Sequence, residues 1–183
     1  MILAGGRLTR EKGYDVLLEA LGALSREQHA DWRAVLIGSG PERQRLQTLS
    51  VELGLQDRLD FVAWAEPETF ADYVQTCDVF VAPARFDHFP TTVIAAMQAG
   101  VALVATDAVG SAVEFVDPGR NGILCRAESA TALAQPLARL IDDAPERLRL
   151  AAAGRDTMRQ WPVERGARMI VDAAREAARS CAA

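Results

Sequence analysis

DVFVAPARFDHFPTTVIAAMQAGVALV, residues 78–104, is the segment that decides the fold of this chain. It starts with an apolar run over residues 79–82, and a polar and aromatic loop occupies residues 85–90. Residues 91–99 have a helical pattern, and a second β-branched run covers residues 101–104. Strand, loop, helix and strand in this order predict a βαβ unit with parallel strands. A right-handed crossover places the loop after each strand at one edge of the sheet, so this loop is the first candidate for a binding site.

The same alternation of strand and helix extends over the rest of the chain. Four further apolar runs predict strands, at residues 1–4, 34–37, 59–63 and 123–125, and the strand that begins at residue 101 is expected to extend to residue 106. Helical spacing predicts helices at residues 14–24, 41–53, 68–76, 129–141, 145–159 and 163–178. Residues 112–116 fit either a short turn of helix or a strand. The sequence therefore predicts an α/β fold, a Rossmann-like doubly wound parallel sheet of about six strands with extra C-terminal helices.

Several residues mark the expected ends of these helices. Pro41 suits the first position of a helix, and Gly54 suits the position that follows a helix. Ser129 is a suitable N-cap because its hydroxyl can accept a bond from the first turn. Residues 117–122, DPGRNG, have the composition of a tight turn.

Composition limits the classes of protein that the chain can belong to. Its 183 residues suffice for one domain, and 50% hydrophobic with 25% charged residues are ordinary values for a globular protein. A net charge of -5, from 20 Lys and Arg against 25 Asp and Glu, argues against a surface for nucleic acid. The three cysteines Cys77, Cys125 and Cys181 lack metal-site spacing and are odd in number, which favours a reducing, cytoplasmic setting.

The chain has no apolar run close to the roughly 18 residues of a membrane span, and no signal-peptide pattern. Residues 1–4 have the character of the end of a strand. We therefore expect residues 1–183 to be one domain that belongs to a longer protein.

Cations and helix starts follow the predicted strands. Four loops should emerge at one edge of the sheet, at residues 5–13, 38–42, 63–66 and 85–92. Arg7 and Lys12 lie close in sequence to a helix start, and Thr91 and Thr92 offer free N–H groups at another. These groups are the ingredients of a pyrophosphate clamp. A solvated, charged loop is the alternative for Arg7 and Lys12.

Three other residues at this edge are candidates with a simpler alternative. Gly38 and Gly40 let the backbone approach a ligand, although a G-S-G segment is also common in a tight turn. Trp64 could stack on a base, whereas an aromatic residue at a strand end more often packs against its own protein.

Asp87 and His88 are the carboxylate and the imidazole of the 85–92 loop. They are natural partners for sugar hydroxyls or for a proton, and the alternative for His88 is a loop histidine without catalytic duty. A serine or cysteine nucleophile is disfavoured because the chain has no G-x-S-x-G elbow and no cysteine in a glycine-rich loop.

Taken together, three segments resemble the C-terminal, donor-binding half of a retaining GT-B glycosyltransferase of the family 4 group. GGRLTREKGYDVLLEAL (5–21) is similar to its G-R-L-x-x-x-K-G-x-x-x-L-x-x-A opening, and VLIGSGPER (35–43) to its x-I-x-G-x-G-P-E segment. Residues 78–125 resemble its D-x-x-x-x-P-S-x-x-E-G-F-G-x-x-x-x-E-A-M-A-x-G-x-P-V-V-A-T core and E-x-V-x-x-G-x-x-G tail. The resemblance covers nearly the whole chain and implies one of two Rossmann-like domains that face a cleft.

The resemblance also implies roles for single residues. Arg7 and Lys12 match the basic pair that contacts the donor's phosphates, and Gly40 lies in the glycine segment of the donor edge. Asp87 and Ala95 match the two carboxylates of the family's E-x7-E motif. This sequence departs from the motif, because Asp87 is shorter than glutamate and Ala95 lacks the carboxylate expected to hold the ribose hydroxyls.

Two further departures lie in the same loop. His88 and Pro90 replace the glycines on either side of the family's phenylalanine. Thr91 and Thr92 still offer backbone N–H groups, so the resemblance implies donor contacts from this loop and from the helix start.

The implied function is transfer of a sugar from a nucleotide-sugar to an acceptor glycan or lipid-linked glycan, with Asp87, Arg7 and Lys12 as the catalytic residues. The resemblance implies no metal and no cofactor, and the chain has no Asp-x-Asp motif. The acceptor is expected on an N-terminal domain absent from this chain, so we expect no transfer by residues 1–183 alone. Membrane association, if any, is expected only through that missing half.

Two alternatives remain open at this point. A non-catalytic module that binds a nucleotide-sugar or a glycan is favoured by Ala95 and the altered loop, whereas Arg7 and Lys12 favour the enzyme. A sugar-nucleotide epimerase of the same architecture resembles residues 87–97 less closely. The sequence does not select the sugar, the base or the acceptor.

Overall fold

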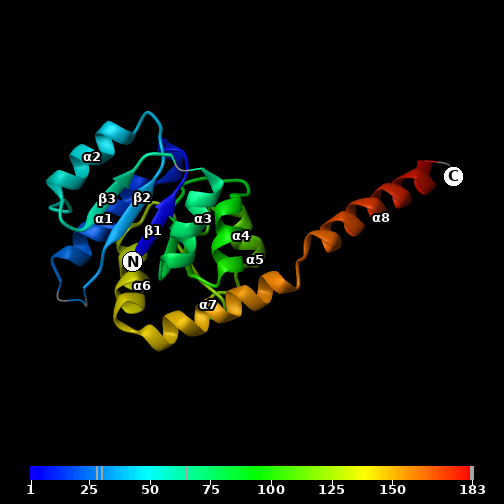
Figure 1. The fold of residues 1–183 in the computed structure, drawn as a ribbon. Coiled ribbons are helices and arrows are strands. Elements are labelled where there is room, and N and C mark those ends of the chain that lie inside the picture. Colours follow the sequence, from blue (N-terminus) through cyan, green and yellow to red (C-terminus); the bar gives the residue numbers. More distant parts are fainter. Residues whose placement is uncertain (28, 30, 65, 182–183) are drawn as a thin grey trace.

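Six parallel strands form one sheet, and helices cover both of its faces (Figure 1). The computed structural model describes residues 1–27, 29, 31–64 and 66–181. The strands are β1 (Ile2–Gly5), β2 (Ala34–Ile37), β3 (Leu59–Val62), β4 (Val79–Ala82), β5 (Ala102–Thr106) and β6 (Ile123–Cys125). Their order in the sheet is β3-β2-β1-β4-β5-β6, the order of a doubly wound Rossmann-like sheet. The predicted fold class is confirmed.

The predicted helices are also present. They are α1 (Tyr14–Ser25), α2 (Arg43–Glu52), α3 (Pro67–Thr76), α4 (Thr91–Ala99), α5 (Gly110–Phe115), α6 (Ala130–Asp142), α7 (Ala144–Arg159) and α8 (Val163–Cys181), with a 3-10 turn η1 (Arg10–Lys12) before α1. The segment that fitted helix or strand belongs to helix α5. Ser129 is the N-cap of α6, because its hydroxyl accepts a bond from the Ala132 amide at 3.1 Å.

Helix α2 begins two residues later than the sequence predicts, so Pro41 is not its first residue. The amide of Glu42 donates to the carbonyl of Leu8 at 3.0 Å, and the amide of Arg43 donates to the carbonyl of Gly40 at 3.2 Å. These bonds hold residues 41 and 42 in a turn against the β1–α1 loop. A contact with a distant loop has therefore replaced the local helix signal.

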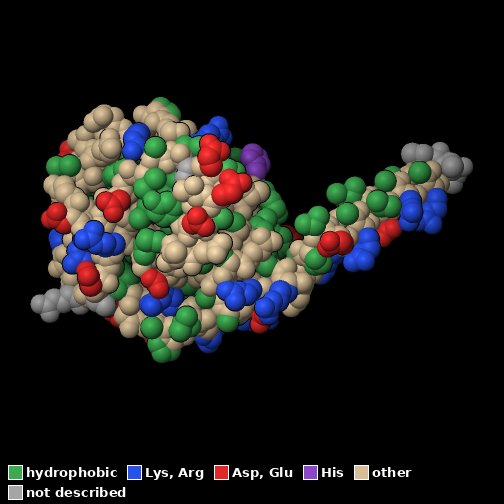
Figure 2. Space-filling view, viewed as in Figure 1, with side chains coloured by type: hydrophobic (Ala, Val, Ile, Leu, Met, Phe, Trp, Pro, Cys, Tyr) green, Lys and Arg blue, Asp and Glu red, His purple; other side chains and the backbone are tan. Residues whose placement is uncertain are grey.

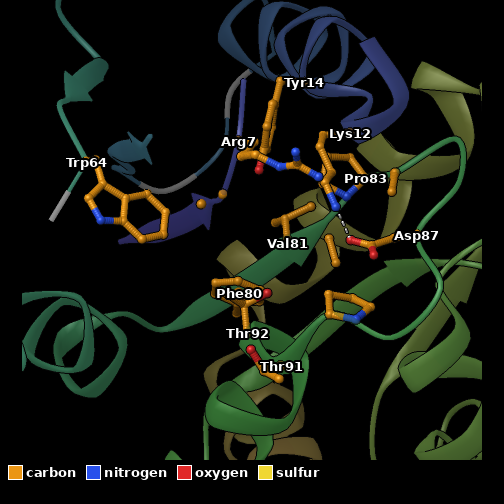
Figure 3. A pocket seen from close by; sticks show the side chains of 15 residues that line it. Arg7, Lys12, Tyr14, Trp64, Phe80, Val81, Pro83, Asp87, Thr91 and Thr92 are labelled. Carbon is orange, nitrogen blue, oxygen red and sulfur yellow. Dashed lines mark hydrogen bonds and ion pairs between the residues drawn. The ribbon is translucent and has the colours of Figure 1, made fainter. Parts of the chain in front are cut away.

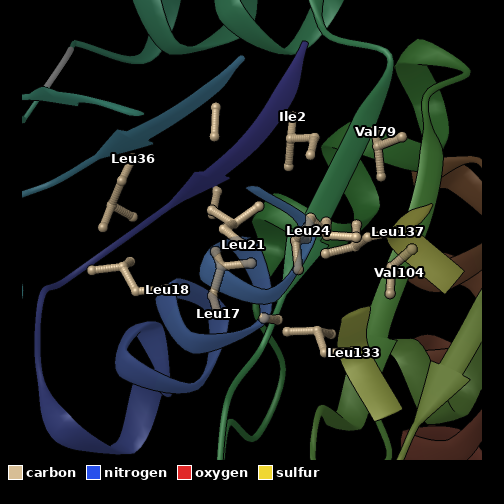
Figure 4. Close-up of a cluster of buried hydrophobic side chains, with 14 of the residues drawn as sticks. Ile2, Leu17, Leu18, Leu21, Leu24, Leu36, Val79, Val104, Leu133 and Leu137 are labelled. Atoms are coloured by element: carbon tan, nitrogen blue, oxygen red, sulfur yellow. The ribbon is translucent and has the colours of Figure 1, made fainter. Parts of the chain in front are cut away.

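Both faces of the sheet are buried, as expected for parallel strands between two helical layers. Side chains alternate along each strand, so that Val79 faces one layer and Phe80 the other. On one face, leucines of α1 and α6 pack on strands β1, β4 and β5 (Figure 4). On the other face, α3, α4 and α5 cover the sheet with residues such as Val93 and Met97.

The chain reverses its direction across the sheet between β1 and β4. From β1 the strands proceed to β2 and β3, whereas from β4 they proceed to β5 and β6 on the other side. Loops after β1 and β4 therefore diverge and leave a crevice at the carboxyl edge, which is where open α/β sheets bind ligands. This crevice places residues 6–13 opposite residues 83–92.

The last two helices differ in their relation to the sheet. Helix α7 packs on α4 and β5, whereas α8 projects away from the rest of the domain (Figure 1). Side chains of residues 162–179 are exposed. Figure 2 shows Lys and Arg side chains along one side of α8 and hydrophobic side chains along the other. No helix in the described part of the chain is both long and apolar enough to cross a membrane.

Candidate functional site

A cavity of about 300 Å³ lies in the crevice between β1 and β4 (Figure 3). We call it the charged cavity, because Arg7, Lys12 and Asp87 line it. Thr91 and Thr92 line it from the start of α4. The structure thus brings together five of the residues that the sequence predicts for the site, from two loops that are about 80 residues apart in the chain.

The two cations of the charged cavity have different partners. Lys12 Nζ donates to Asp87 Oδ2 at 2.5 Å, and both side chains are largely buried. The side chain of Arg7 is exposed and makes no hydrogen bond or ion pair with the described residues. Lys12 is therefore held in place by a carboxylate, whereas the guanidinium of Arg7 is available to an anion.

Helix α4 points its N-terminus at the cavity. Its N-cap is Pro90, which makes no side-chain capping bond to the first turn. The first N–H groups of an α-helix have no partner within the helix, and the helix dipole gives this end a partial positive charge. The start of α4 thus adds donors to the positive charge of Arg7 and Lys12.

Tyr14 also lines the charged cavity, beside the cations. It was not among the site residues predicted from the sequence. Its ring is buried, and burial together with the charge of Asp87 raises the pKa of its hydroxyl. The hydroxyl therefore stays protonated and can donate a hydrogen bond. The sequence carries a weak signal for it, because Tyr14 directly follows Gly13 at the start of α1.

A second cavity, of about 470 Å³, adjoins the first between α3 and α4. We call it the apolar cavity: Pro67, Phe70, Ile94 and Ala95 line it, and no charged side chain of the described residues does. The two cavities share four lining residues, which are Gly6, Trp64, Thr91 and Thr92. A ligand can therefore extend from a charged compartment into an apolar one.

Trp64 stands at the boundary between the two cavities, with 59% of its surface exposed. It follows β3 and its ring projects toward the crevice (Figure 3). Trp64 does not pack in the core, because a core tryptophan would be buried, and packing at the rim of the crevice remains the alternative to stacking on a base. The predicted loop 63–66 contains Ala65, which lies outside the described residues.

Gly38 and Gly40 line neither of the two cavities. A Cβ at Gly38 would lie 2.0 Å from the carbonyl oxygen of Gly6, and one at Gly40 would lie 2.4 Å from that of Leu8. Both glycines therefore allow the β2–α2 loop to pack on the β1–α1 loop. The structure thus gives them a supporting role behind Arg7, and their contact with a ligand stays a prediction.

His88 also lies outside both cavities. Its side chain is exposed, and its ring packs edge-on against Phe86 with the centroids 4.6 Å apart. Pro90 lines the charged cavity, as predicted, and Ala95 lines only the apolar one. The carboxylate of this loop that faces the charged cavity is Asp87.

The sequence analysis missed an ion pair behind the charged cavity. Arg85 binds both carboxylate oxygens of Asp15, at 2.7 and 3.1 Å. Arg45 reaches the same carboxylate at 3.2 Å. The available signal was an aspartate in the apolar helix segment YDVLLEAL, because a carboxylate that becomes buried requires a partner.

Metal ligation has little support in the described part of the chain. Among those residues no group of three or more His, Cys, Asp or Glu side chains is placed to hold a metal ion. Cys77 and Cys125 are buried free thiols, and burial raises their pKa values to about 12 and about 11. Neither thiol is a ready ligand or nucleophile. The side chain of Cys181 lies outside the described part.

Comparison with known proteins places this fold and site in a family. The sequence profile described as "Glycosyl transferases group 1" matches residues 1–157. The lipopolysaccharide core biosynthesis mannosyltransferase LpsB of Rhizobium meliloti is 34% identical in an alignment of 176 residues, and this alignment covers 90% of this chain and 48% of LpsB. The chain belongs to the glycosyl transferases group 1 family.

Solved structures agree with this assignment. The C-terminal domain of the group 1 glycosyl transferase LpcC from Francisella tularensis has a TM-score of 0.79 and 25% identity, covering 87% of this chain and 84% of that one. Sucrose-phosphate synthase from Thermosynechococcus elongatus has a TM-score of 0.84 and 28% identity, covering 96% of this chain and 45% of that one. The chain spans about half the length of LpsB.

Proposed function

We propose that this chain is the donor-binding domain of a retaining glycosyltransferase and that it holds a nucleotide-sugar at the carboxyl edge of its sheet. One observation carries the proposal: Arg7, Lys12 and the N-terminus of α4 line one cavity, which adjoins an apolar cavity beside Trp64. A diphosphate needs positive charge and N–H donors, and a nucleoside needs an apolar surface on which to stack. The two compartments offer these chemistries side by side.

Each part of the donor has a place in this arrangement. The diphosphate lies between Arg7, Lys12 and the start of α4. The sugar lies near Asp87, whose carboxylate accepts hydrogen bonds from its hydroxyls. The nucleoside extends over Trp64 toward Ile94 and Ala95. Membership of the glycosyl transferases group 1 family supports this placement.

Transfer of the sugar leaves a nucleoside diphosphate with increased negative charge. Arg7 and Lys12 stabilise that charge, and fixed donors act more strongly in a cavity that excludes water. In the retaining reaction that we propose, an oxygen of the leaving phosphate accepts the proton of the acceptor hydroxyl. The proposal gives the role of neutralising the diphosphate to these cations and not to a metal ion or cofactor.

The acceptor, which we propose to be a glycan or a lipid-linked glycan, binds to a part of the protein outside this chain. The spans of the relatives support this view, since this chain covers 48% of LpsB. We place the domain in the cytoplasm, because Cys77 and Cys125 are buried free thiols. The purified chain is then expected to transfer no sugar, because both reactants have to be positioned in one cleft. Transfer to a simple acceptor well above the rate of spontaneous hydrolysis contradicts this.

A second candidate function is a non-catalytic module that binds a nucleotide-sugar or a glycan. Two observations favour it: Ala95 offers no side-chain hydrogen-bonding group to the apolar cavity, and His88 lines neither cavity. The partly buried ion pair between Lys12 and Asp87 favours the enzyme.

Binding of diphosphates tests the proposal. Thermal shift and calorimetry with UDP-, GDP- and ADP-sugars, and with the matching diphosphates, should show stabilisation by at least one pair. At about 100 times its dissociation constant, such a ligand stabilises the domain by roughly 2.7 kcal/mol. The proposal is contradicted if none of the three pairs raises the melting temperature of the domain. Binding of free glycans but of no nucleotide supports the second candidate.

A further inference from the structure

Arg85, in the loop after β4, bonds to two sites that lie 70 and 75 residues earlier in the chain, Asp15 at the start of α1 and the carbonyl of Arg10. Its guanidinium binds the two carboxylate oxygens of Asp15 as a fork, at 2.7 and 3.1 Å. Asp15 belongs to the first turn of α1 and is 9% exposed, whereas Arg85 lies in the β4–α4 loop. A bidentate contact fixes the orientation of both side chains as well as their distance.

The same arginine holds the main chain directly before Lys12. Arg85 Nη1 donates to the carbonyl of Arg10 at 2.9 Å. Two consecutive main-chain amides, beginning at Arg85, donate to the carbonyl of Glu11 at 2.8 and 3.2 Å. Lys12 follows these carbonyls, and Asp87 follows these amides. The Arg85 side chain, together with the main-chain amides of Arg85 and Phe86, therefore sets the separation of the two loops at the point where Lys12 meets Asp87.

We propose that Arg85 and Asp15 are positioning residues for the charged cavity. They act through Lys12 and Asp87 and do not touch the ligand, since neither lines the cavity. This inference rests on the proposed function. Binding of a diphosphate depends on where Lys12 stands, and a site that is loose by about 1 Å loses much of its effect.

The pair stays charged under ordinary conditions. Burial raises the pKa of Asp15, but the hydrogen bonds and charge of Arg85, together with a bond from Arg45, outweigh burial and leave that pKa below its usual range. Asp15 is then an anion at neutral pH, and an anion accepts both bonds of the fork. The contact between the loops therefore persists at the pH at which the protein works.

Arg45 provides a matched control. It donates to the same carboxylate of Asp15 at 3.2 Å, but it comes from α2 and bonds to neither loop 10–12 nor loop 85–87. Arg85→Met and Arg45→Met each remove one arginine from Asp15. We expect Arg85→Met to weaken binding of inorganic pyrophosphate about tenfold or more, and Arg45→Met to change it less than about twofold. Pyrophosphate is the probe because it does not depend on the base.

A double-mutant cycle separates positioning from general stability. If Arg85 acts through Lys12, the protein with Lys12→Ala and Arg85→Met binds pyrophosphate no worse than the one with Lys12→Ala alone. The inference is overturned if the losses of pyrophosphate affinity caused by the two substitutions multiply in the double mutant. It is also overturned if the Arg85→Met protein binds pyrophosphate as tightly as the parent. Should Arg85→Met not fold, Asp15→Asn replaces it in the same cycle, because it keeps the size of the side chain and removes the charge.

Arg85→Lys gives a further readout. Lysine restores the charge near Asp15 but not the fork, so we expect it to recover only part of the lost affinity. Full recovery by lysine overturns the bidentate role. If the parent binds neither pyrophosphate nor any nucleoside diphosphate, the proposed function and this inference are both overturned. If the parent protein binds a diphosphate but the losses in the double-mutant cycle are additive, this inference is overturned and the proposed function remains.

Discussion

The two edges of the sheet use charged side chains in different ways. At the amino edge, cations and anions bind one another: Arg147 lies 3.7 Å from Asp78, and His29 lies between Asp142 and Glu27. These contacts join helices α6 and α7 to the loops before β2 and β4. Their effect is on the stability of the domain.

At the carboxyl edge, the charges face a cavity. Arg7 has no partner within the described residues, and Lys12 is held beside the cavity by Asp87. The ion pair between Arg85 and Asp15 lies behind this cavity and holds the loops that carry Lys12 and Asp87. Charged side chains thus stabilise the amino edge through ion pairs, whereas at the carboxyl edge they line a cavity in which an anion can bind. Substitutions at the carboxyl edge should change binding, and substitutions at the amino edge should change stability.

The largest expected effect is the loss of stabilisation by ligand in Lys12→Ala and in Arg7→Ala. Each should remove much of the roughly 2.7 kcal/mol that a nucleoside diphosphate contributes at 100 times its dissociation constant. Thermal shift with and without ligand measures this effect. If both variants bind as well as the parent, the phosphate clamp is wrong.

The unliganded stabilities of these two variants should differ. Arg7 is exposed and unpaired among the described residues, so Arg7→Ala should change the free energy of unfolding by less than about 0.5 kcal/mol. Lys12→Ala leaves the largely buried Asp87 without its partner and should cost about 1 to 3 kcal/mol. Chemical denaturation distinguishes the two, and an equal cost would mean that the Lys12 ion pair contributes nothing.

Ala95→Glu should tighten binding of a ribonucleoside diphosphate. Residue 95 lines the apolar cavity about one turn into α4, where a carboxylate could accept bonds from the ribose hydroxyls. The gain is at most about 1.5 to 3 kcal/mol, and desolvation of the carboxylate reduces it. Calorimetry with the matching 2′,3′-dideoxyribose ligand is the control and should show no gain. Unchanged or weaker binding of the ribose form means that α4 does not face the nucleoside.

Trp64→Ala tests whether the two cavities hold different parts of one ligand. Loss of a stacked base should cost about 1 to 3 kcal/mol of binding free energy for a nucleoside diphosphate. Binding of inorganic pyrophosphate should stay as in the parent, because Lys12 and Arg7 are intact. An equal loss for both ligands would show that Trp64 shapes the charged cavity and does not bind a base.

The smallest expected effect is a pH dependence at the amino edge. The hydrogen bonds that His29 makes with Asp142 and Glu27, at 2.7 and 2.9 Å, raise its pKa in the folded protein, and only the protonated ring can donate both. This contribution is fully present below the pKa of unfolded histidine, about 6.5, and is lost as the pH rises through the folded value.

His29→Gln should therefore be less stable than the parent at pH 5 to 6, and the difference should shrink at higher pH. Melting temperatures between pH 5 and 9 measure it, and binding of pyrophosphate should not change. A difference that grows with pH would mean that neutral His29 is the form that the fold stabilises.

Local pattern predicted almost all of the fold. Alternation of strand and helix, the glycine after α2 and the cap at Ser129 are short-range signals, and each strand is found within one residue of its expected ends. The rule for parallel strands then predicted that Arg7, Lys12, Asp87 and the start of α4 share one edge. Helix α2 started late because Glu42 bonds to Leu8, which lies in a different loop.

By itself, the sequence determined the doubly wound parallel sheet and the charged edge, because periodicity and right-handed crossovers leave few other arrangements. Tertiary structure alone decided which neighbours in sequence face the charged cavity. Asp87 points into the charged cavity and His88 does not, while Gly38 and Gly40 support the loop of Arg7 instead of lining the site. Such outcomes depend on contacts between segments tens of residues apart. Local sequence patterns carry no information about those contacts, because they describe only residues that are close in sequence.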